Sequence, residues 1–124
     1  MTKIVLVVED HPIIRGTTAL FLCDAGYHVL EASNANAAIL MLESRSDIRA
    51  VFSDITMPGS MDGLKLIHAV RERWPPVVLI LASGRAPPLV TDMPVDTVFL
   101  GKPYRHSDVL DLLEAVDWEA AVAA

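Results

Sequence analysis

The stretch VVEDHP, residues 7–12, ends an apolar run with two adjacent carboxylates and a proline. The run itself, Ile4–Val8, is short and rich in valine, which predicts a strand buried on both faces, as in a parallel sheet. Pro12 suits the first turn of a helix, because its fixed φ and missing N–H are tolerated there. The stretch therefore predicts a strand that passes into a helix, with Glu9 and Asp10 at the junction.

The same pattern recurs along the chain. Apolar runs at Ala50–Phe52 and Val77–Ala82 predict two more buried strands. Shorter, more mixed runs at His28–Glu31 and Thr97–Leu100 predict edge strands. Between the runs lie helix-length segments with apolar residues at three- and four-residue spacing. Five strands alternating with helices predict an α/β fold with a doubly wound, five-stranded parallel sheet and helices on both faces, in one domain over residues 1–124.

Two helical segments carry specific expectations. The spacing in the first predicts a buried stripe made of Ile14, Thr18, Phe21 and Ala25. The segment Arg85–Asp96 holds three prolines, which leave room for a helix of at most about two turns. The fourth helix of the fold is therefore expected to be short or irregular.

Composition excludes several classes of protein. The 124 residues carry a net charge of −6, which argues against a direct nucleic-acid partner. No apolar run approaches the roughly 20 residues that span a bilayer, and the N-terminal run is too short for a signal peptide. The single cysteine excludes an internal disulfide framework and suits a reducing compartment. We expect a cytoplasmic protein that does not bind a membrane.

Polar groups follow four of the predicted strands: Glu9 and Asp10 the first, Asp54 the third, Ser83 the fourth and Lys102 the fifth. Ligands of doubly wound sheets bind outside the carboxyl ends of the strands, so these groups are expected to share one crevice. Three gathered carboxylates repel one another, and a divalent cation removes that conflict. Oxygen donors suit Mg²⁺ better than zinc. With a lysine and a hydroxyl beside the metal, the crevice suits a phosphoryl group in transfer to a carboxylate nucleophile.

Four segments in order, LVVED, FSDITMPGSMDGLKL, LILASG and FLGKPY, resemble the motifs of response-regulator receiver domains, the phospho-acceptor part of two-component signalling. The resemblance covers nearly the whole chain and implies a flavodoxin-like strand order of 2-1-3-4-5. It implies that a histidine kinase or a histidine phosphotransfer protein phosphorylates Asp54 in a phosphorelay. Because only WEAAVAA follows the last helix predicted from the sequence, with Leu110, Leu113 and Val116 as its buried side, we expect a stand-alone response regulator without a DNA-binding output domain. It would act on an unknown downstream protein as a monomer or weak dimer, with no enzymatic activity beyond its own phosphorylation and dephosphorylation.

The resemblance also assigns roles to individual residues. The implied ligands of Mg²⁺ are Asp10, Glu9 through water, Asp54 and the backbone carbonyl of Thr56. The implied phosphoryl contacts are the side chains of Lys102 and Ser83 and the backbone of Thr56 and Gly84. Both sets converge on Asp54, the expected phospho-acceptor.

Four further expectations concern the switch and the loops. Ser83 would move toward the attached phosphoryl group, and Phe99 would rotate with it. From the residues alone, Ser83 could instead be a turn serine and Phe99 a plain core aromatic. The bond between Lys102 and Pro103 is expected to be cis. Gly63 would close the loop that follows the third strand.

Three other functions share parts of this pattern. A phosphatase of the dehalogenase type also uses an aspartate nucleophile and Mg²⁺, but it requires a second acid two residues later, where this chain has Thr56. A docking module that signals without phosphate would not need the full set of site residues. A flavodoxin-like carrier would need a hydroxyl-rich phosphate loop after the first strand, where this chain has EDHP.

Overall fold

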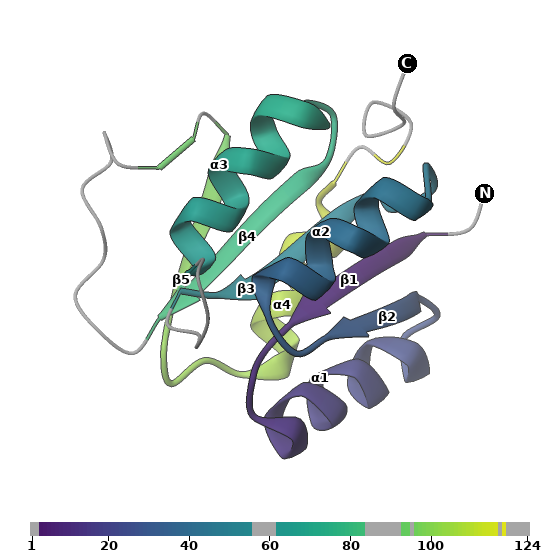
Figure 1. Ribbon diagram of the computed structural model, residues 1–124. Coiled ribbons are helices and arrows are strands. Elements are labelled where there is room, and N and C mark those ends of the chain that lie inside the picture. Colours follow the sequence, from purple (N-terminus) through teal and green to yellow (C-terminus); the bar gives the residue numbers. More distant parts are fainter. Residues whose placement is uncertain (1–2, 56–61, 84–92, 95, 117, 119–124) are drawn as a thin grey trace.

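Figure 1 shows the computed structural model, which describes residues 3–55, 62–83, 93–94, 96–116 and 118. The strands are β1 (Ile4–Val8), β2 (His28–Ala32), β3 (Ala50–Asp54), β4 (Val78–Ser83) and β5 (Thr97–Gly101). The helices in the described part of the chain are α1 (Pro12–Asp24), α2 (Ala35–Ser44), α3 (Gly63–Arg73) and α4 (His106–Glu114).

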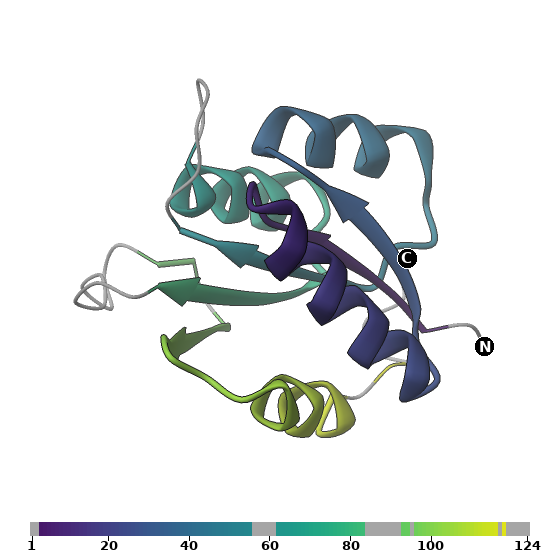
Figure 2. The same cartoon turned by 90° about the horizontal axis from the view of Figure 1, so that it is seen from below.

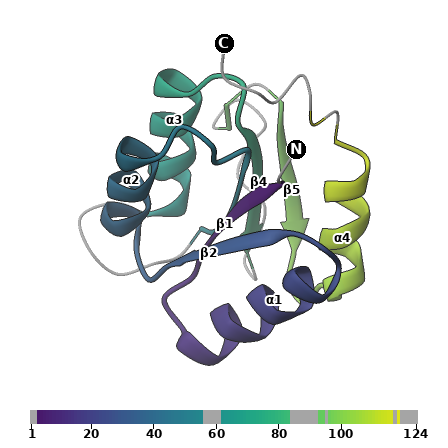
Figure 3. The same cartoon turned by 90° about the vertical axis from the view of Figure 1, so that its right-hand side faces the viewer.

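The five strands form one parallel sheet in the order β2-β1-β3-β4-β5, which confirms the predicted fold. Helices α2 and α3 cover one face of the sheet, and α1 and α4 cover the other (Figures 2 and 3). The expected short or irregular fourth helix falls at 85–96, of which only residues 93, 94 and 96 are described. Helix α4 follows β5 and is the last helix in the described part of the chain.

Successive side chains of a strand point to opposite faces of the sheet, and the buried ones form a hydrophobic core on each face. Leu6 of β1 and Leu79 of β4 belong to the cluster that contains the buried residues of α2 and α3. Val7, Phe52 and Ile80 belong to the cluster that contains the buried residues Leu22 of α1 and Leu113 of α4. These strand residues are at most 4% exposed. Packing from both sides holds the strands in register, and this fixes where their ends lie.

Side-chain caps define where two of the helices begin. Asn34 precedes α2, and its side chain accepts a hydrogen bond of 2.8 Å from the N–H of Ala37. Asp62 precedes α3 and accepts one of 2.9 Å from the N–H of Lys65. Such caps satisfy N–H groups that the first helical turn leaves without partners. Helix α3 therefore starts at Gly63, close to the end of β3.

Helix α1 packs through a face that differs from the predicted stripe. Its buried residues are Thr18, Ala19 and Leu22. The prediction was right for Thr18 and, with partial burial, for Phe21, and it was wrong for Ile14 and Ala25, both of which are exposed. The contact face is turned by about one residue toward Ala19 and Leu22, because Leu22 fits the core between the sheet and α4. The start of α1 thus presents an apolar side chain to solvent.

Because all strands run the same way, their carboxyl ends lie along one edge of the sheet. The name carboxyl edge is used here for the strand ends Val8, Ala32, Asp54, Ser83 and Gly101 and the residues that directly follow them. The amino edge is the opposite one, where the strands begin. None of the described helices is long and apolar enough to cross a membrane.

Candidate functional site

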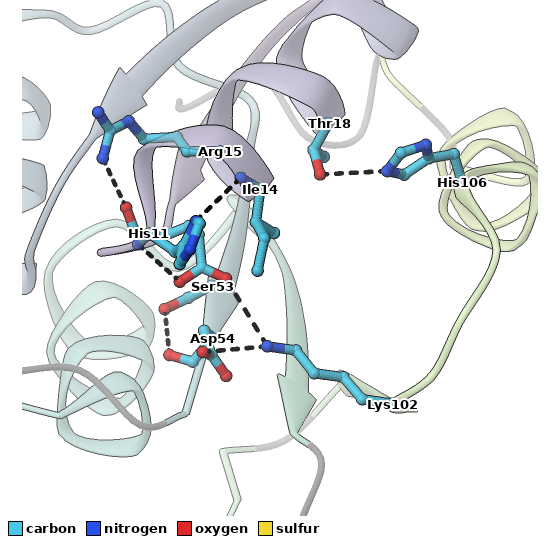
Figure 4. Close-up of polar contacts among 9 residues, drawn as sticks. His11, Ile14, Arg15, Thr18, Ser53, Asp54, Lys102 and His106 are labelled. Carbon is cyan, nitrogen blue, oxygen red and sulfur yellow. Dashed lines mark hydrogen bonds and ion pairs between the residues drawn. The ribbon is translucent and has the colours of Figure 1, made fainter.

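Three carboxylates meet at the carboxyl edge, as the sequence predicted. One oxygen from each of Glu9, Asp10 and Asp54 lies within 4.8 Å of the other two. Lys102 reaches the cluster from beyond β5: its Nζ lies 3.1 Å from Asp54 Oδ2 and 3.6 Å from Glu9 Oε1. Figure 4 shows the Lys102 side chain extended toward Asp54. Residues far apart in sequence therefore form one charged site.

Glu9 is the buried member of the cluster, whereas Asp10 is exposed. Burial raises the pKa of the Glu9 carboxyl, and its hydrogen bond with Asp10 and the charge of Asp54 add to that rise. A hydrogen bond of 3.3 Å from the backbone N–H of His11 to Glu9 Oε2 and the charge of Lys102 oppose the rise without cancelling it. The ionised site is thus short of positive charge.

Lys102 supplies part of that positive charge. Partial burial lowers the pKa of its ammonium group, but the hydrogen bond and charge of Asp54, together with Glu9, raise it above the ordinary value. Its backbone N–H donates a hydrogen bond of 2.8 Å to the carbonyl of Ser83, which ties the end of β5 to the end of β4. The bond between Lys102 and Pro103 is cis, as predicted.

Close packing holds Asp54 against the start of α3. The N–H of Gly63 donates a hydrogen bond of 2.8 Å to the carbonyl of Ile55. A Cβ atom at Gly63 would overlap the backbone carbonyl oxygen of Asp54, so this position admits no side chain. The expected role of Gly63 in closing the loop after β3 is consistent with these contacts.

The donor set fits Mg²⁺. This ion takes six oxygens at about 2.1 Å in an octahedron, so its ligand oxygens lie about 3 to 4 Å apart. One oxygen from each carboxylate lies within 4.8 Å of the other two, which is compatible with such a shell, and water can complete it. The cluster contains only carboxylates, whereas zinc sites are built mainly from Cys and His.

The sequence matches the family model of the response regulator receiver domain over residues 5–114. The chain belongs to this family. Receivers are signalling domains of two-component systems rather than classical enzymes, and they interact with histidine kinases or phosphotransfer proteins. They bind Mg²⁺ at an acidic site, and the carboxylate cluster of this receiver fits that description.

Individual proteins similar to this chain are response regulators as well. The receiver is 31% identical over 114 residues to a putative NtrX-like response regulator of Rickettsia bellii, a match that covers 89% of this chain and 24% of that protein. It thus spans about a quarter of the length of the NtrX-like relatives. The structure of a response regulator receiver protein from Sinorhizobium medicae has a TM-score of 0.84 and 28% identity, covering 92% of this chain and 96% of that one.

A further solved structure shares the fold at lower identity. It is the response regulator TrrA from Thermotoga maritima in complex with Mg(2+)-BeF. Its TM-score is 0.79 at 24% identity, with 91% of this chain and 97% of that chain covered. At this identity the likeness concerns the fold of the receiver.

The remaining predicted residues lie on β4 and β5 or outside the described part of the chain. Ser83 is buried at the end of β4, where it pairs in register with Gly101. Phe99 is partly buried beside Leu81, two positions earlier in the same pair of strands. Thr56 and Gly84, predicted to contribute backbone groups, lie outside the described residues, as do positions 57–61 of the loop.

Among the described residues of this receiver, Arg15 and Tyr104 also contact or line the site, and neither was predicted from the sequence. Arg15 Nη1 donates a hydrogen bond of 2.9 Å to the backbone carbonyl of Glu9 (Figure 4). Tyr104 lines a small pocket with Glu9, Asp54 and Lys102, and its ring meets Phe52 edge-on at 5.6 Å between centroids. The signal for Tyr104 was its place two residues after Lys102, but an arginine in a first helical turn carries no comparable signal.

Proposed function

We propose that this receiver accepts a phosphoryl group on Asp54, in a Mg²⁺-dependent reaction, from a histidine kinase or a histidine phosphotransfer protein. The observation that carries the proposal is the environment of the Asp54 carboxylate. It lies 3.1 Å from Lys102 Nζ and belongs to the same oxygen cluster as Glu9 and Asp10. A nucleophile, a cation and the ligands for a metal thus meet at one side chain.

In the proposed transfer, a carboxylate oxygen of Asp54 attacks the phosphorus of a phosphohistidine. The new P–O bond forms as the P–N bond to the imidazole breaks, and the imidazole takes up a proton from water. Mg²⁺, when bound, supplies positive charge beside the phosphoryl oxygens. Lys102 supplies a second positive charge, and its raised pKa keeps the ammonium protonated at neutral pH.

The proposed metal ligands are Asp10 and Asp54 directly, Glu9 through water, and the backbone carbonyl of Thr56. The buried position of Glu9 suits an outer role, because its Oε2 already accepts a hydrogen bond from His11 N–H. The more exposed Asp10 is better placed to bind an ion that keeps several waters. The predicted backbone contacts of Thr56 and Gly84 with the phosphoryl group remain part of the proposal.

The proposed output is a change at Ser83 and Phe99. Ser83 is buried at the strand end next to Lys102, and Phe99 lies on the neighbouring strand with partial exposure. A hydroxyl that moves toward the phosphoryl group would leave space into which a partly buried ring can turn. The downstream protein that responds to this change is unknown.

An apolar surface beside the site supports a protein as the phosphoryl donor. Ile13 and Ile14, in the first turn of α1, are 73% and 41% exposed. Ile14 also lines an open pocket together with Lys102, Pro103 and Tyr104. Exposed apolar side chains around a charged site are suited to a protein that must bring a phosphohistidine to Asp54.

The proposal also covers the location, the domain organisation and the oligomeric state of the protein. We expect a cytoplasmic, single-domain regulator over residues 1–124, monomeric or weakly dimeric, with no membrane or nucleic-acid partner. The curated NtrX-like relatives extend well beyond the matched region, so the stand-alone form stays a prediction. A dehalogenase-type phosphatase is disfavoured because Thr56 stands where that chemistry requires an acid.

The test is incubation with Mg²⁺ and acetyl phosphate, followed by intact-protein mass spectrometry. Wild type is expected to gain one phosphoryl group, and Asp54→Asn none. Asp47→Asn is the matched control, because Asp47 forms an ion pair with Arg45 at the amino edge and should not affect uptake. The Mg(2+)-BeF complex of TrrA suggests beryllofluoride as a second probe.

Other outcomes would favour the alternatives. A phosphoryl group retained by Asp54→Asn would contradict the assignment of the acceptor. Steady release of phosphate from many monoesters by wild type would favour the phosphatase. No uptake from acetyl phosphate or from purified phosphohistidine proteins would favour the docking module.

A further inference from the structure

Arg15 links the metal-binding loop to the edge of the sheet. Its Nη1 donates a hydrogen bond of 2.9 Å to the backbone carbonyl of Glu9, and its Nε lies 3.3 Å from Glu31 Oε1 on β2. The Arg15 side chain is 20% exposed and that of Glu31 45%. Figure 4 shows Arg15 bending back from α1 toward the loop that follows β1.

The bonded carbonyl belongs to the peptide unit that joins Glu9 to Asp10. On its other side, the N–H of Glu9 donates a hydrogen bond of 3.0 Å to the carbonyl of Ala32. Both backbone groups of Glu9 are therefore anchored to the end of β2, one directly through Ala32 and one through Arg15 and Glu31. Rotation of the Glu9–Asp10 peptide would break the Arg15 bond, and that rotation would also move the Asp10 carboxylate.

We propose that Arg15 is a positioning residue that holds the Glu9–Asp10 peptide ready for Mg²⁺, with Glu31 orienting its guanidinium. This inference rests on the proposed function and deepens it. Ligands held in place before the metal arrives bind it more tightly, and loss of a supporting contact around a metal site typically weakens binding about 10- to 100-fold. The described contacts of Arg15 include the backbone of Glu9 but no carboxylate of the cluster.

The sign of the effect separates positioning from simple electrostatics. Arg15 carries a positive charge near a site for a cation, so its charge alone opposes Mg²⁺ binding. Removal of that charge without loss of position would tighten binding. Loss of position weakens it. The structure therefore predicts that Arg15→Met weakens Mg²⁺ binding although it removes a repulsive charge.

The experiment is a calorimetric titration of Mg²⁺ into wild type, Arg15→Met and Arg15→Lys, with the melting temperature of each metal-free protein measured in parallel. Arg15→Met is expected to raise the Kd for Mg²⁺ about tenfold. Arg15→Lys should recover part of the loss, because an ammonium group can reach one of the two oxygens but lacks the fork that bonds both. Arg73→Met is the matched control, since it removes an exposed ion pair with Glu43 at the amino edge. The Kd of Arg73→Met for Mg²⁺ should equal that of wild type.

Glu31→Gln tests the same link while leaving Arg15 in place. It should raise the Kd less than Arg15→Met, and in the double variant the two effects should not add. An unchanged or tighter Kd in a folded Arg15→Met would overturn the inference while leaving the proposed function intact. A wild type that does not bind Mg²⁺ at all would overturn the metal dependence of the proposed function, and the role of Arg15 with it.

Discussion

The two edges of the sheet carry charge in different ways. At the amino edge, Arg73 and Glu43 form a one-to-one ion pair at 2.8 Å in which both side chains are more than 40% exposed. At the carboxyl edge, three acids form one cluster, and Lys102 pairs with two of them, Glu9 and Asp54, among the described residues. The side chains of Glu9 and Asp54 are there only 7% and 13% exposed. The charges of the pair at the amino edge are balanced and exposed to solvent, whereas those of the cluster at the carboxyl edge are unbalanced and partly buried.

This difference shows which charges serve stability and which serve function. An exposed ion pair contributes about 0 to 1 kcal/mol and can be lost without much effect. A partly buried group of like charges destabilises the fold until a ligand balances it, so its presence needs a reason other than stability. The imbalance at the carboxyl edge therefore points to a site for a cation, as the proposed binding of Mg²⁺ requires.

The largest expected contrast between the edges is in phosphorylation. Lys102→Met should slow phosphoryl uptake from acetyl phosphate by about 100-fold or more, because it removes a charge aimed at the transferring group. Arg73→Met removes a cation of the same sign from the amino edge and should leave the rate unchanged. Time courses by mass spectrometry at saturating Mg²⁺ measure both rates. Equal slowing in the two variants would mean that net charge, rather than position, controls uptake.

Two glycines extend the comparison to packing. A methyl group at Gly63, at the carboxyl edge, would overlap the Asp54 carbonyl oxygen, so Gly63→Ala should lower the free energy of unfolding by about 2 to 3 kcal/mol. Gly26, at the amino edge, has a φ of 102° and open space around it, so Gly26→Ala should cost about 1 to 2 kcal/mol through backbone strain alone. Urea denaturation measures both changes.

Only one of these glycine variants should alter the chemistry. Folded Gly63→Ala should accept the phosphoryl group from acetyl phosphate more slowly than wild type, because the backbone of Asp54 must shift. Folded Gly26→Ala should match wild type. Normal uptake by Gly63→Ala would show that the backbone of Asp54 can move without harm to the site.

A smaller contrast concerns the stability of the metal-free protein. At neutral pH, Glu9→Gln should raise the free energy of unfolding, because burial and the neighbouring acids disfavour the ionised carboxylate and thereby raise the pKa of Glu9. Glu43→Gln should lower it by about 1 kcal/mol or less, through loss of the pair with Arg73. Denaturation in the presence of a chelator tests the opposite signs. If both variants are destabilised, the carboxyl edge is better balanced without metal than its contacts indicate.

Sequence alone predicted the layout of the carboxyl edge because that layout follows from short-range rules. Apolar runs predicted the buried strands, parallel strands share one carboxyl edge, and the acids and the lysine directly follow strand ends. The contact of Arg15 with Glu9 follows from no such rule, since it depends on the angle at which α1 leaves the sheet and on the nearby end of β2. The face of α1 was misjudged at Ile14 for a related reason. Periodicity defines a stripe, but packing against α4 and the sheet selects which side of it is buried.

The two tyrosines of the chain lie near opposite edges of the sheet. Tyr27 directly precedes β2 at the amino edge, and Tyr104 lies near the carboxyl edge. Burial raises the pKa of both phenols. Glu114 adds to the rise at Tyr27, whereas Lys102 and a hydrogen bond with Thr18 lessen it at Tyr104. The lysine of the site thus acts on one tyrosine of the two.

The smallest prediction follows from that asymmetry. Both phenols should ionise above pH 10, and the stability linked to their raised pKa values is complete below pH 10 and lost as the pH rises through those values. Lys102→Met should raise the pKa of Tyr104 further, because it removes a charge that favours the phenolate, and should leave Tyr27 unchanged. Tyrosinate absorbance resolves the two titrations when each tyrosine is replaced in turn by phenylalanine. A Tyr104 pKa that does not respond to Lys102→Met would mean that Asp54 and Glu9 neutralise the ammonium charge. The positive charge of Lys102 would then have no effect on the Tyr104 phenol.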